Sequence, residues 1–343
     1  AAVALVVFAL AWTHRTTAVD FPAEAAGSLL SLAGDARAEV HHRAGAASDL
    51  LFSRREGRDD ESAAPVKKPS PHVIRRDGHV SVPGGILVLP SSLEPADDGT
   101  FDLLVHFHGN TAVVRESADV AGLNAAVAIV NLGIGSAPYE EYYAVGGTYE
   151  DLLAAAVEGV RQRGVKDAKL GRVALSAWSA GYGAVSSILV SRKGHEHLDA
   201  ILIFDGIHGS LDDGRLNRLQ MGPFSRAATR AAKGEIYFGF THSDIDPRLY
   251  AGTRITADYL IAEVGAERRP LDPVADQPGY LELTSMRGAV SKRLEKRMEP
   301  TSEARIGTLH VIGYKGETKE HHMAHLFQMG ATLLPELVTR WSL

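Results

Sequence analysis

Short apolar runs alternate with helical patterns along the second part of the chain. The runs are "FDLLVHFHG", "AAVAIVNLG", "RVALSAW", "AILIFDG", "EIYFGF" and "GTLHVIGY". Each is apolar almost throughout, which is typical of strands buried on both faces of a parallel sheet. Between the second and third runs, residues 148–164 carry apolar side chains at helical spacing, and Thr148 with Asp151 resembles a capping box. This alternation predicts an α/β fold, with a mostly parallel central sheet and helices on both faces.

The same pattern places the folded body at residues 72–343. It opens with "HVSVPGGILVLP" (residues 79–90), whose alternation and Pro-Gly-Gly turn predict a β-hairpin. Residues 248–305 form a long excursion before the last predicted strand, with one helical pattern, "TADYLIAEVGAE". We expect this excursion to act as a lid or as a wall of the substrate site.

The amino-terminal part reads differently. Residues 1–12, "AAVALVVFALAW", are too few to span a bilayer as a helix but suit the apolar region of a signal peptide or the remnant of an anchor. An ordinary helix packed on the domain is the alternative. Residues 13–71 predict a weakly helical, low-complexity extension that ends in a charged, proline-containing linker. We therefore expect a secreted or membrane-anchored, extracytoplasmic protein with N-terminal membrane association.

Composition narrows the chemistry. The chain has 343 residues, a formal net charge of -6 and no basic stripe, so nucleic acid is not an expected partner. It contains no cysteine, which excludes disulfides, thiolate metal sites and a cysteine nucleophile.

One serine stands between a strand pattern and a helix pattern. In "RVALSAWSAGYGAVSSILV" the residues two before and two after Ser179 are Ala177 and Gly181. Small side chains at both places allow a strand and a helix to approach closely around a tight turn that exposes the serine. A serine hydroxyl needs a neighbouring base to become a nucleophile, so the rest of the chain must supply one.

Histidines follow the last strand. In "GETKEHHMAHLF" the candidates are His321, His322 and His325. We favour His322 as the base because it lies where the loop meets the last helix, and His325, one turn further, as a buttress or the alternative base. His321 and His325 have the spacing of two zinc ligands on a helix, but the glutamate of the H-E-x-x-H motif is missing, so we expect no metal.

The acid that orients the base has two candidates at strand ends. Asp244 comes shortly after the strand "EIYFGF", and Asp205 ends the strand "AILIFDG". Asp246 is a weaker third candidate. The residue types do not separate Asp244 from Asp205. If Asp205 is not the acid, we expect it to make a structural contact, for example with His208.

The order Ser179, aspartate, His322, with "AWSAGYG" around the serine and "HGN" upstream, resembles the α/β-hydrolase superfamily of serine esterases and lipases. The resemblance spans about residues 72–343 and departs from G-x-S-x-G at Ala177, where glycine is usual. It implies an oxyanion hole formed by the backbone N–H groups of Ala180 and Asn110, with Thr111 as the next choice for the second donor.

Three further residues are candidates for supporting roles: His108 in the "HGN" loop, His208, and Trp178, which would line an acyl pocket or belong to the core. His106 reads as an ordinary strand-end residue. The resemblance implies a serine hydrolase that cleaves a small-molecule or lipid-like ester through an acyl-enzyme and needs no cofactor. A peptidase or amidase on the same fold and a non-catalytic binding protein are the alternatives.

Overall fold

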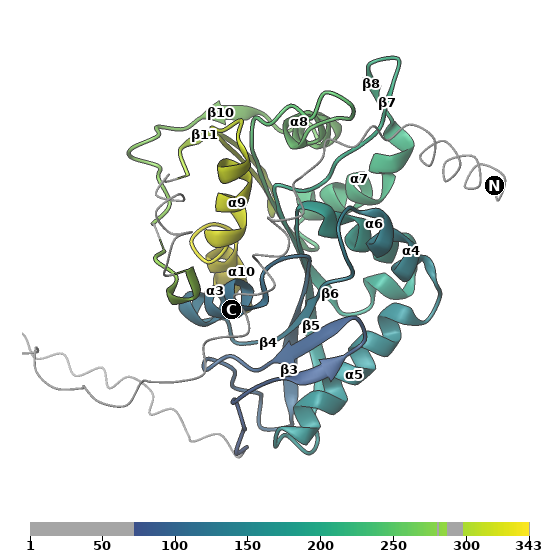
Figure 1. The fold of residues 1–343 in the computed structure, drawn as a ribbon, viewed down its shortest axis with the longest axis vertical. Coiled ribbons are helices and arrows are strands. Elements are labelled where there is room, and N and C mark those ends of the chain that lie inside the picture. The colour runs from purple at the N-terminus through teal and green to yellow at the C-terminus, as the bar shows by residue number, and fades with distance from the viewer. Residues whose placement is uncertain (1–71, 280, 287–297, 343) are drawn as a thin grey trace, which may run out of the picture. The chain divides into compact units, whose positions relative to one another are not determined.

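The computed structural model describes residues 72–279, 281–286 and 298–342, and Figure 1 shows their ribbon. The predictions for residues 1–12 and 13–71 lie outside this range. Within it, the strands are β1 (Val80–Val82), β2 (Gly85–Val88), β3 (Thr100–Phe107), β4 (Ala126–Val130), β5 (Lys169–Trp178), β6 (Leu198–Phe204), β7 (Leu211–Asp212), β8 (Arg215–Leu216), β9 (Tyr237–His242), β10 (Arg268–Pro270), β11 (Pro300–Ile306) and β12 (Leu309–Tyr314). The α-helices are α3 (Thr111–Ala121), α4 (Ala137–Ala144), α5 (Thr148–Gln162), α6 (Tyr182–Val190), α7 (Arg218–Ala232), α8 (Thr253–Glu263), α9 (Lys319–Phe327) and α10 (Leu334–Trp341), and the short 3₁₀ turns are η1 (Ser179–Gly181), η2 (Lys193–His195) and η3 (Thr284–Met286).

In these described residues, a ten-stranded sheet runs in the order β1-β2-β4-β3-β5-β6-β9-β12-β11-β10. The strands from β4 to β12 in that order pair in parallel. Antiparallel pairs occur at the two edges, where β1 and β2 form the hairpin predicted at residues 79–90. The prediction of a mostly parallel sheet is therefore confirmed.

Helices cover both faces of the sheet, and alternate residues of each strand point to opposite faces. In β3, Leu103 and Val105 pack with the cluster that includes α4, α5, α6, α7 and α8. Leu104 packs with the opposite cluster, which includes α3, α9 and α10. Figure 1 shows the same division, with α9 and α10 on one side of the strands and α4 to α7 on the other.

One local prediction is wrong. Helix α5 begins at Thr148, but its N-cap is Gly147 in a left-handed conformation (φ 93°), without a side-chain cap. Thr148 is the first residue of the helix and not its N-cap, so the capping box expected from Thr148 and Asp151 is absent. The excursion at residues 248–305 contains the predicted helix, α8, and also β10 and most of β11, which extend the sheet at its edge. Its role as a lid or wall of the substrate site stays a prediction.

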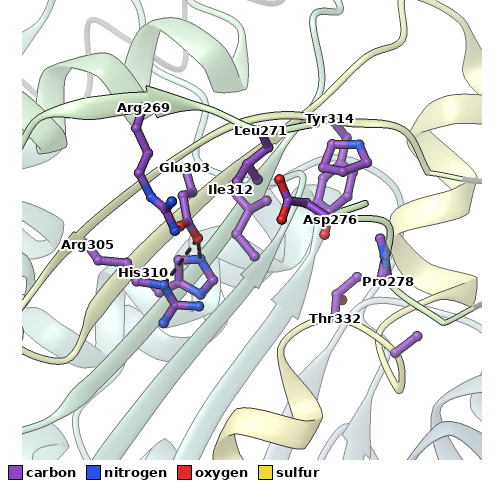
Figure 2. A pocket seen from close by; sticks show the side chains of 12 residues that line it. Arg269, Leu271, Asp276, Pro278, Glu303, Arg305, His310, Ile312, Tyr314 and Thr332 are labelled. Atoms are coloured by element: carbon purple, nitrogen blue, oxygen red, sulfur yellow. Dashed lines mark hydrogen bonds and ion pairs between the residues drawn. The ribbon is translucent and has the colours of Figure 1, made fainter. Parts of the chain in front are cut away.

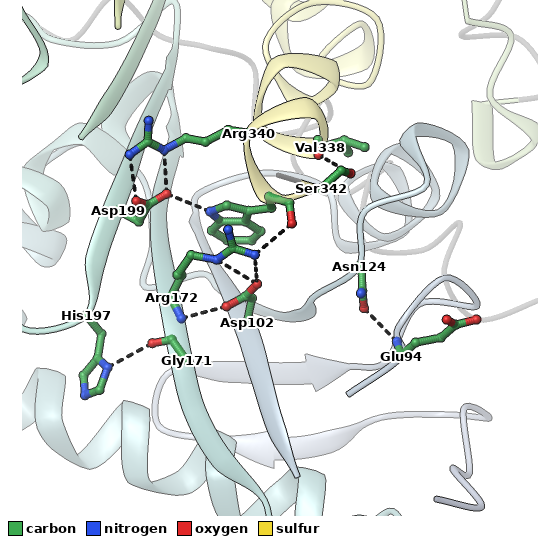
Figure 3. A network of polar contacts seen from close by, with 11 residues as sticks. Glu94, Asp102, Asn124, Gly171, Arg172, His197, Asp199, Val338, Arg340 and Ser342 are labelled. Atoms are coloured by element: carbon green, nitrogen blue, oxygen red, sulfur yellow. Dashed lines mark hydrogen bonds and ion pairs between the residues drawn. The ribbon is translucent and has the colours of Figure 1, made fainter. Parts of the chain in front are cut away.

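A polar network fastens the last helix to the start of three central strands (Figure 3). Near the start of β5, the Arg172 guanidinium donates to Asp102 of β3 at 2.8 Å and to the carbonyl oxygen of Trp341 at 2.9 Å. Arg340 and the Trp341 indole donate to Asp199 of β6, the indole at 2.8 Å. These contacts lie at the amino ends of the parallel strands, so they leave the carboxyl ends free for chemistry.

Over the described residues, no helix combines the length and the apolar character needed to cross a bilayer.

Candidate active site

Ser179 occupies a strained turn directly after β5. Its φ of 50° lies in the left-handed region, which is uncommon for residues other than glycine. The turn is pressed against the neighbouring strand: a Cβ added to Gly181 would stand 2.1 Å from the carbonyl oxygen of Phe107 in β3. The strand–turn–helix arrangement expected around Ser179 is therefore present, and the second small position accepts only glycine without a shift of the backbone.

The serine lies in a hydrogen-bonded chain with a histidine and an aspartate. The Ser179 hydroxyl oxygen is 2.8 Å from Nε2 of His322, which belongs to the first turn of α9. Nδ1 of the same ring is 2.6 Å from Oδ2 of Asp205, at the end of β6. A carboxylate only accepts, so Nδ1 carries the proton and Nε2 is free to accept from the serine hydroxyl.

The Asp205 carboxylate is 1% exposed and receives further hydrogen bonds. The Ser243 backbone N–H donates to Oδ1 at 2.8 Å, the Ser243 hydroxyl to Oδ2 at 2.9 Å, and the Thr253 hydroxyl to Oδ1 at 2.6 Å. Burial alone would raise the pKa of this carboxyl, but the nearby His325 and the hydrogen bonds from His322 and Thr253 hold its pKa well below the usual range. The carboxylate therefore stays charged and faces the imidazole with a fixed orientation.

Asp244, the other candidate acid, has a different partner. Its carboxylate accepts from Arg254 at 3.0 Å, and its backbone N–H donates to the carbonyl oxygen of Gly316. Asp246, the weaker candidate, accepts from the backbone N–H of Arg248 at 2.8 Å. The structure thus brings Asp205 to the imidazole and leaves Asp244 in an ion pair elsewhere. Asp205 directly follows β6, and Ser243 directly follows β9, the neighbouring strand in the sheet. Which carboxylate meets the imidazole therefore depends on which strands are neighbours.

His325 and His208 lie close to the hydrogen-bonded series of Ser179, His322 and Asp205 but form no hydrogen bond with these three residues. His325 is buried and shares a hydrogen bond of 2.8 Å with the Thr241 hydroxyl, and burial lowers its pKa to about 4. His208 contacts the carbonyl oxygen of Ala251 at 3.4 Å rather than Asp205. Of the two alternative bases, His322 is therefore the one in contact with Ser179.

His108 and Trp178 form an aromatic stack at the carboxyl ends of β3 and β5. Their rings are 5.3 Å apart and almost parallel, at 7°. His108 Nδ1 is 2.9 Å from the Tyr139 hydroxyl, and burial lowers the pKa of His108 to about 4, so it is uncharged near neutral pH. His106, by contrast, lies near the end of β3, where it is fully buried and contacts the Ser176 hydroxyl.

The loop expected to supply an oxyanion donor is held firmly. The Asn110 side chain caps α3 by accepting from the N–H groups of Ala112 and Val113 at 3.0 and 3.2 Å. Gly109 donates its N–H to Asn131 at 3.0 Å. Ala180 lies in η1, directly after the serine. The assignment of the Asn110 and Ala180 N–H groups to a developing oxyanion stays a prediction.

Sequence reasoning missed Ser243 and Thr253, the residues that hold the aspartate. Thr253 is the first residue of α8, so the first part of the excursion, at α8, contacts the Asp205 carboxylate. No spacing in the sequence signals this contact, because 48 residues separate Thr253 from Asp205.

In the portion of the chain that the structure covers, no group of three or more His, Asp or Glu side chains is placed to hold a metal ion. A cavity of about 260 Å³ lies toward the β10 edge of the sheet, beside β11 and β12 (Figure 2). There the buried Glu303 carboxylate pairs with Arg269, with Arg305 at 3.2 Å and with His310 at 2.9 Å. None of Ser179, His322 and Asp205 lines this cavity.

No family model matches the chain, and no curated protein matches it. Among solved structures, it is similar to the siderophore hydrolase EstB from Aspergillus nidulans, with 15% identity over 82% of this chain and 97% of that one, at a TM-score of 0.37. It is also similar to the carboxylesterase CesB (YbfK) from Bacillus subtilis, with 8% identity over 80% of this chain and 91% of that one, at a TM-score of 0.34. Similarities this low do not bear on substrate or mechanism.

Three features together define the fold class: the strand order, the strained turn at Ser179 after β5, and His322 in the helix after β12. The described part of the chain has the α/β-hydrolase fold, with a mostly parallel central sheet and helices on both faces.

Proposed function

We propose that the protein is a serine hydrolase that cleaves carboxylic esters through an acyl-enzyme, with Ser179 as nucleophile, His322 as general base and Asp205 as the orienting acid. The observation that supports this proposal is the continuous pair of contacts, 2.8 Å from Ser179 Oγ to His322 Nε2 and 2.6 Å from His322 Nδ1 to Asp205 Oδ2. Such distances are those of a base able to take the serine proton.

The reaction proceeds in two halves. Ser179 Oγ attacks the ester carbonyl carbon while its proton passes to His322 Nε2, and the carbonyl oxygen becomes an oxyanion that the N–H groups of Ala180 and Asn110 would stabilise. The tetrahedral intermediate collapses as His322 returns the proton to the departing alcohol oxygen, leaving an acyl group on Ser179. Water then attacks the acyl carbon while its proton passes to the same nitrogen. The bond from the acyl carbon to Ser179 Oγ breaks as His322 returns this proton to Oγ, and the carboxylic acid leaves.

The test is labelling with a fluorophosphonate probe, which reacts with activated serines. We expect the purified protein to be labelled and to hydrolyse p-nitrophenyl esters, and Ser179→Ala to abolish both. Ser187→Ala, on the adjacent helix α6, is the matched control and should leave both intact. Absence of labelling in the folded wild-type protein would show a binding protein on a hydrolase scaffold. Faster turnover of aminoacyl-nitroanilides than of esters would instead indicate a peptidase or amidase.

A further inference from the structure

Trp178 contacts the proposed catalytic base in two ways. As the last residue of β5, it directly precedes the nucleophile. Its indole N–H donates to the backbone carbonyl oxygen of His322 at 3.1 Å. Its ring also lies against the imidazole, with centroids 4.8 Å apart and planes inclined at 31°.

The indole is held rigidly where these contacts form. It is only 9% exposed and packs in the core cluster that also contains Ala324, Leu326 and Phe327 of α9. His108 stacks on the same indole, but burial lowers the pKa of His108 to about 4 and keeps it uncharged near neutral pH. His322 is therefore the imidazole beside Trp178 that becomes charged during the proposed reaction.

An aromatic face attracts a cation placed within about 6 Å of its centre, and tryptophan does so most strongly. In the proposed reaction the imidazole is neutral before attack and positively charged once it holds the serine proton. An indole beside it thus favours the charged form, and the N–H bond to the carbonyl oxygen keeps the first turn of α9 from moving away.

We propose that Trp178 is a positioning residue for His322: its N–H anchors the backbone of the base, and its ring stabilises the imidazolium. This proposal rests on the proposed function. Other groups also face His322, namely Asp205 from β6, His108 from the loop after β3, His208 from the loop after β6, and His325 from α9 itself. The indole adds to their field rather than replacing it.

The experiment compares Trp178→Phe and Trp178→Leu with Trp341→Phe. Trp341 is the matched control, because it is 8% exposed in the same core cluster and its indole N–H also has an acceptor, Asp199, but it does not touch His322. Ester hydrolysis is followed as kcat/KM against pH. Losing the aromatic face makes the imidazolium give up its proton more readily. For Trp178→Leu we therefore expect the acidic limb of the profile to move to lower pH by about half a unit to one unit, with kcat reduced about tenfold or more.

Trp178→Phe keeps an aromatic face and loses the N–H, so its acidic limb should stay near that of the wild type while kcat falls a few-fold. Trp341→Phe should change neither the position of the acidic limb nor kcat. Trp178→Phe and Trp341→Phe should both lower the melting temperature, because each removes buried aromatic surface from the core. A purely structural role for Trp178 would reduce stability without moving the limb, and coincident limbs in Trp178→Leu and the wild type would overturn the proposal. If the leucine variant does not fold, Trp178→Met takes its place, because the unbranched methionine side chain adapts more easily to an irregular space.

An NMR titration of the His322 ring proton, assigned with His322→Gln, tests the same point without substrate. The titration midpoint should be lower in Trp178→Leu than in the wild type and in Trp178→Phe. Because no turnover is measured, a protein without esterase activity would refute the proposed function while this titration still decides the role of Trp178. Equal midpoints in all three proteins would overturn that role.

Discussion

At the residue scale, the two candidate carboxylates differ in what surrounds them. Asp205 is buried, accepts from Ser243 and Thr253, and meets the imidazole at 2.6 Å. Asp244 pairs at 3.0 Å with Arg254, whose side chain is 62% exposed. An exposed ion pair of this kind contributes little to the free energy of unfolding. The buried carboxylate therefore has the geometry for orienting a base, and the other has that of a surface contact.

We accordingly expect Asp205→Asn to lower kcat for ester hydrolysis by about 10⁴, because an amide cannot hold the imidazole in the tautomer that leaves Nε2 free. Asp244→Asn is the control, changing charge in the same way without touching His322, and should stay within about threefold of the wild type. Steady-state kinetics of both variants at saturating ester give the comparison. A large loss in Asp244→Asn with near-normal Asp205→Asn would reverse the assignment.

Thr253 tests the support behind the acid. Replacing it with valine removes the 2.6 Å hydrogen bond to Asp205 and leaves one lone pair of a buried carboxylate unsatisfied. We expect Thr253→Val to lower kcat about tenfold with KM little changed, a loss of about 1.4 kcal/mol, and Thr253→Ser to restore most of it. Thr256→Val is the control for losing a buried hydroxyl hydrogen bond, because Thr256 is a buried threonine of the same helix whose hydroxyl donates to the Ile207 carbonyl oxygen and not to Asp205. Equal kcat values in the two valine variants would argue against the role.

At the element scale, the turn that carries Ser179 (η1, Ser179–Gly181) lies so close to β3 that this distance determines which residues the turn accepts. Gly181 has helical backbone angles (φ −60°, ψ −18°), so alanine would suit its conformation. The obstacle is the Phe107 carbonyl oxygen, 2.1 Å from the added Cβ. We expect Gly181→Ala to destabilise the protein by about 1–3 kcal/mol, as overpacking does, and to lower turnover by displacing Ser179.

Gly146→Ala is the matched substitution, because nothing lies within 4 Å of its added Cβ. Urea denaturation should show a lower free energy of unfolding for Gly181→Ala and an unchanged one for Gly146→Ala. A Gly181→Ala protein as stable and active as the wild type would mean that the turn at Ser179 is not packed as tightly as described.

The elements that the sequence predicted are those with strong local signals. The central strands could be predicted because burial on both faces makes their sequences almost wholly apolar, as in "AILIFDG". Strand β11, "PTSEARI", was missed because it lies near the sheet edge and keeps polar side chains among few buried ones. The sequence could not decide between Asp205 and Asp244 for a different reason. Asp205 and Ser243 meet because β6 and β9 are neighbours, and neighbour order is a property of the whole sheet.

At the scale of the whole molecule, burial of histidines makes stability depend on pH. Burial lowers the pKa of His106 to about 3 and the pKa values of His108, His242 and His325 to about 4. In the unfolded chain each would titrate near 6.5. Between about pH 6.5 and pH 4 the unfolded state therefore binds protons that the folded state does not.

The free energy of unfolding should consequently be highest above pH 6.5 and fall as the pH decreases toward 4, by up to about 1.4 kcal/mol per pH unit for each such histidine. The charged Asp205 adds to the loss below about pH 4, where the unfolded carboxyl becomes protonated first. Urea denaturation at pH 7.5, 6.5, 5.5 and 4.5 measures the slope. His106→Asn removes one of the linked protons and should flatten it, whereas His79→Asn, at an exposed position, should leave it as in the wild type. A constant free energy of unfolding from pH 7.5 to 4.5 would mean that these imidazoles take up protons as readily in the folded protein as in the unfolded chain, and that they are not enclosed as described.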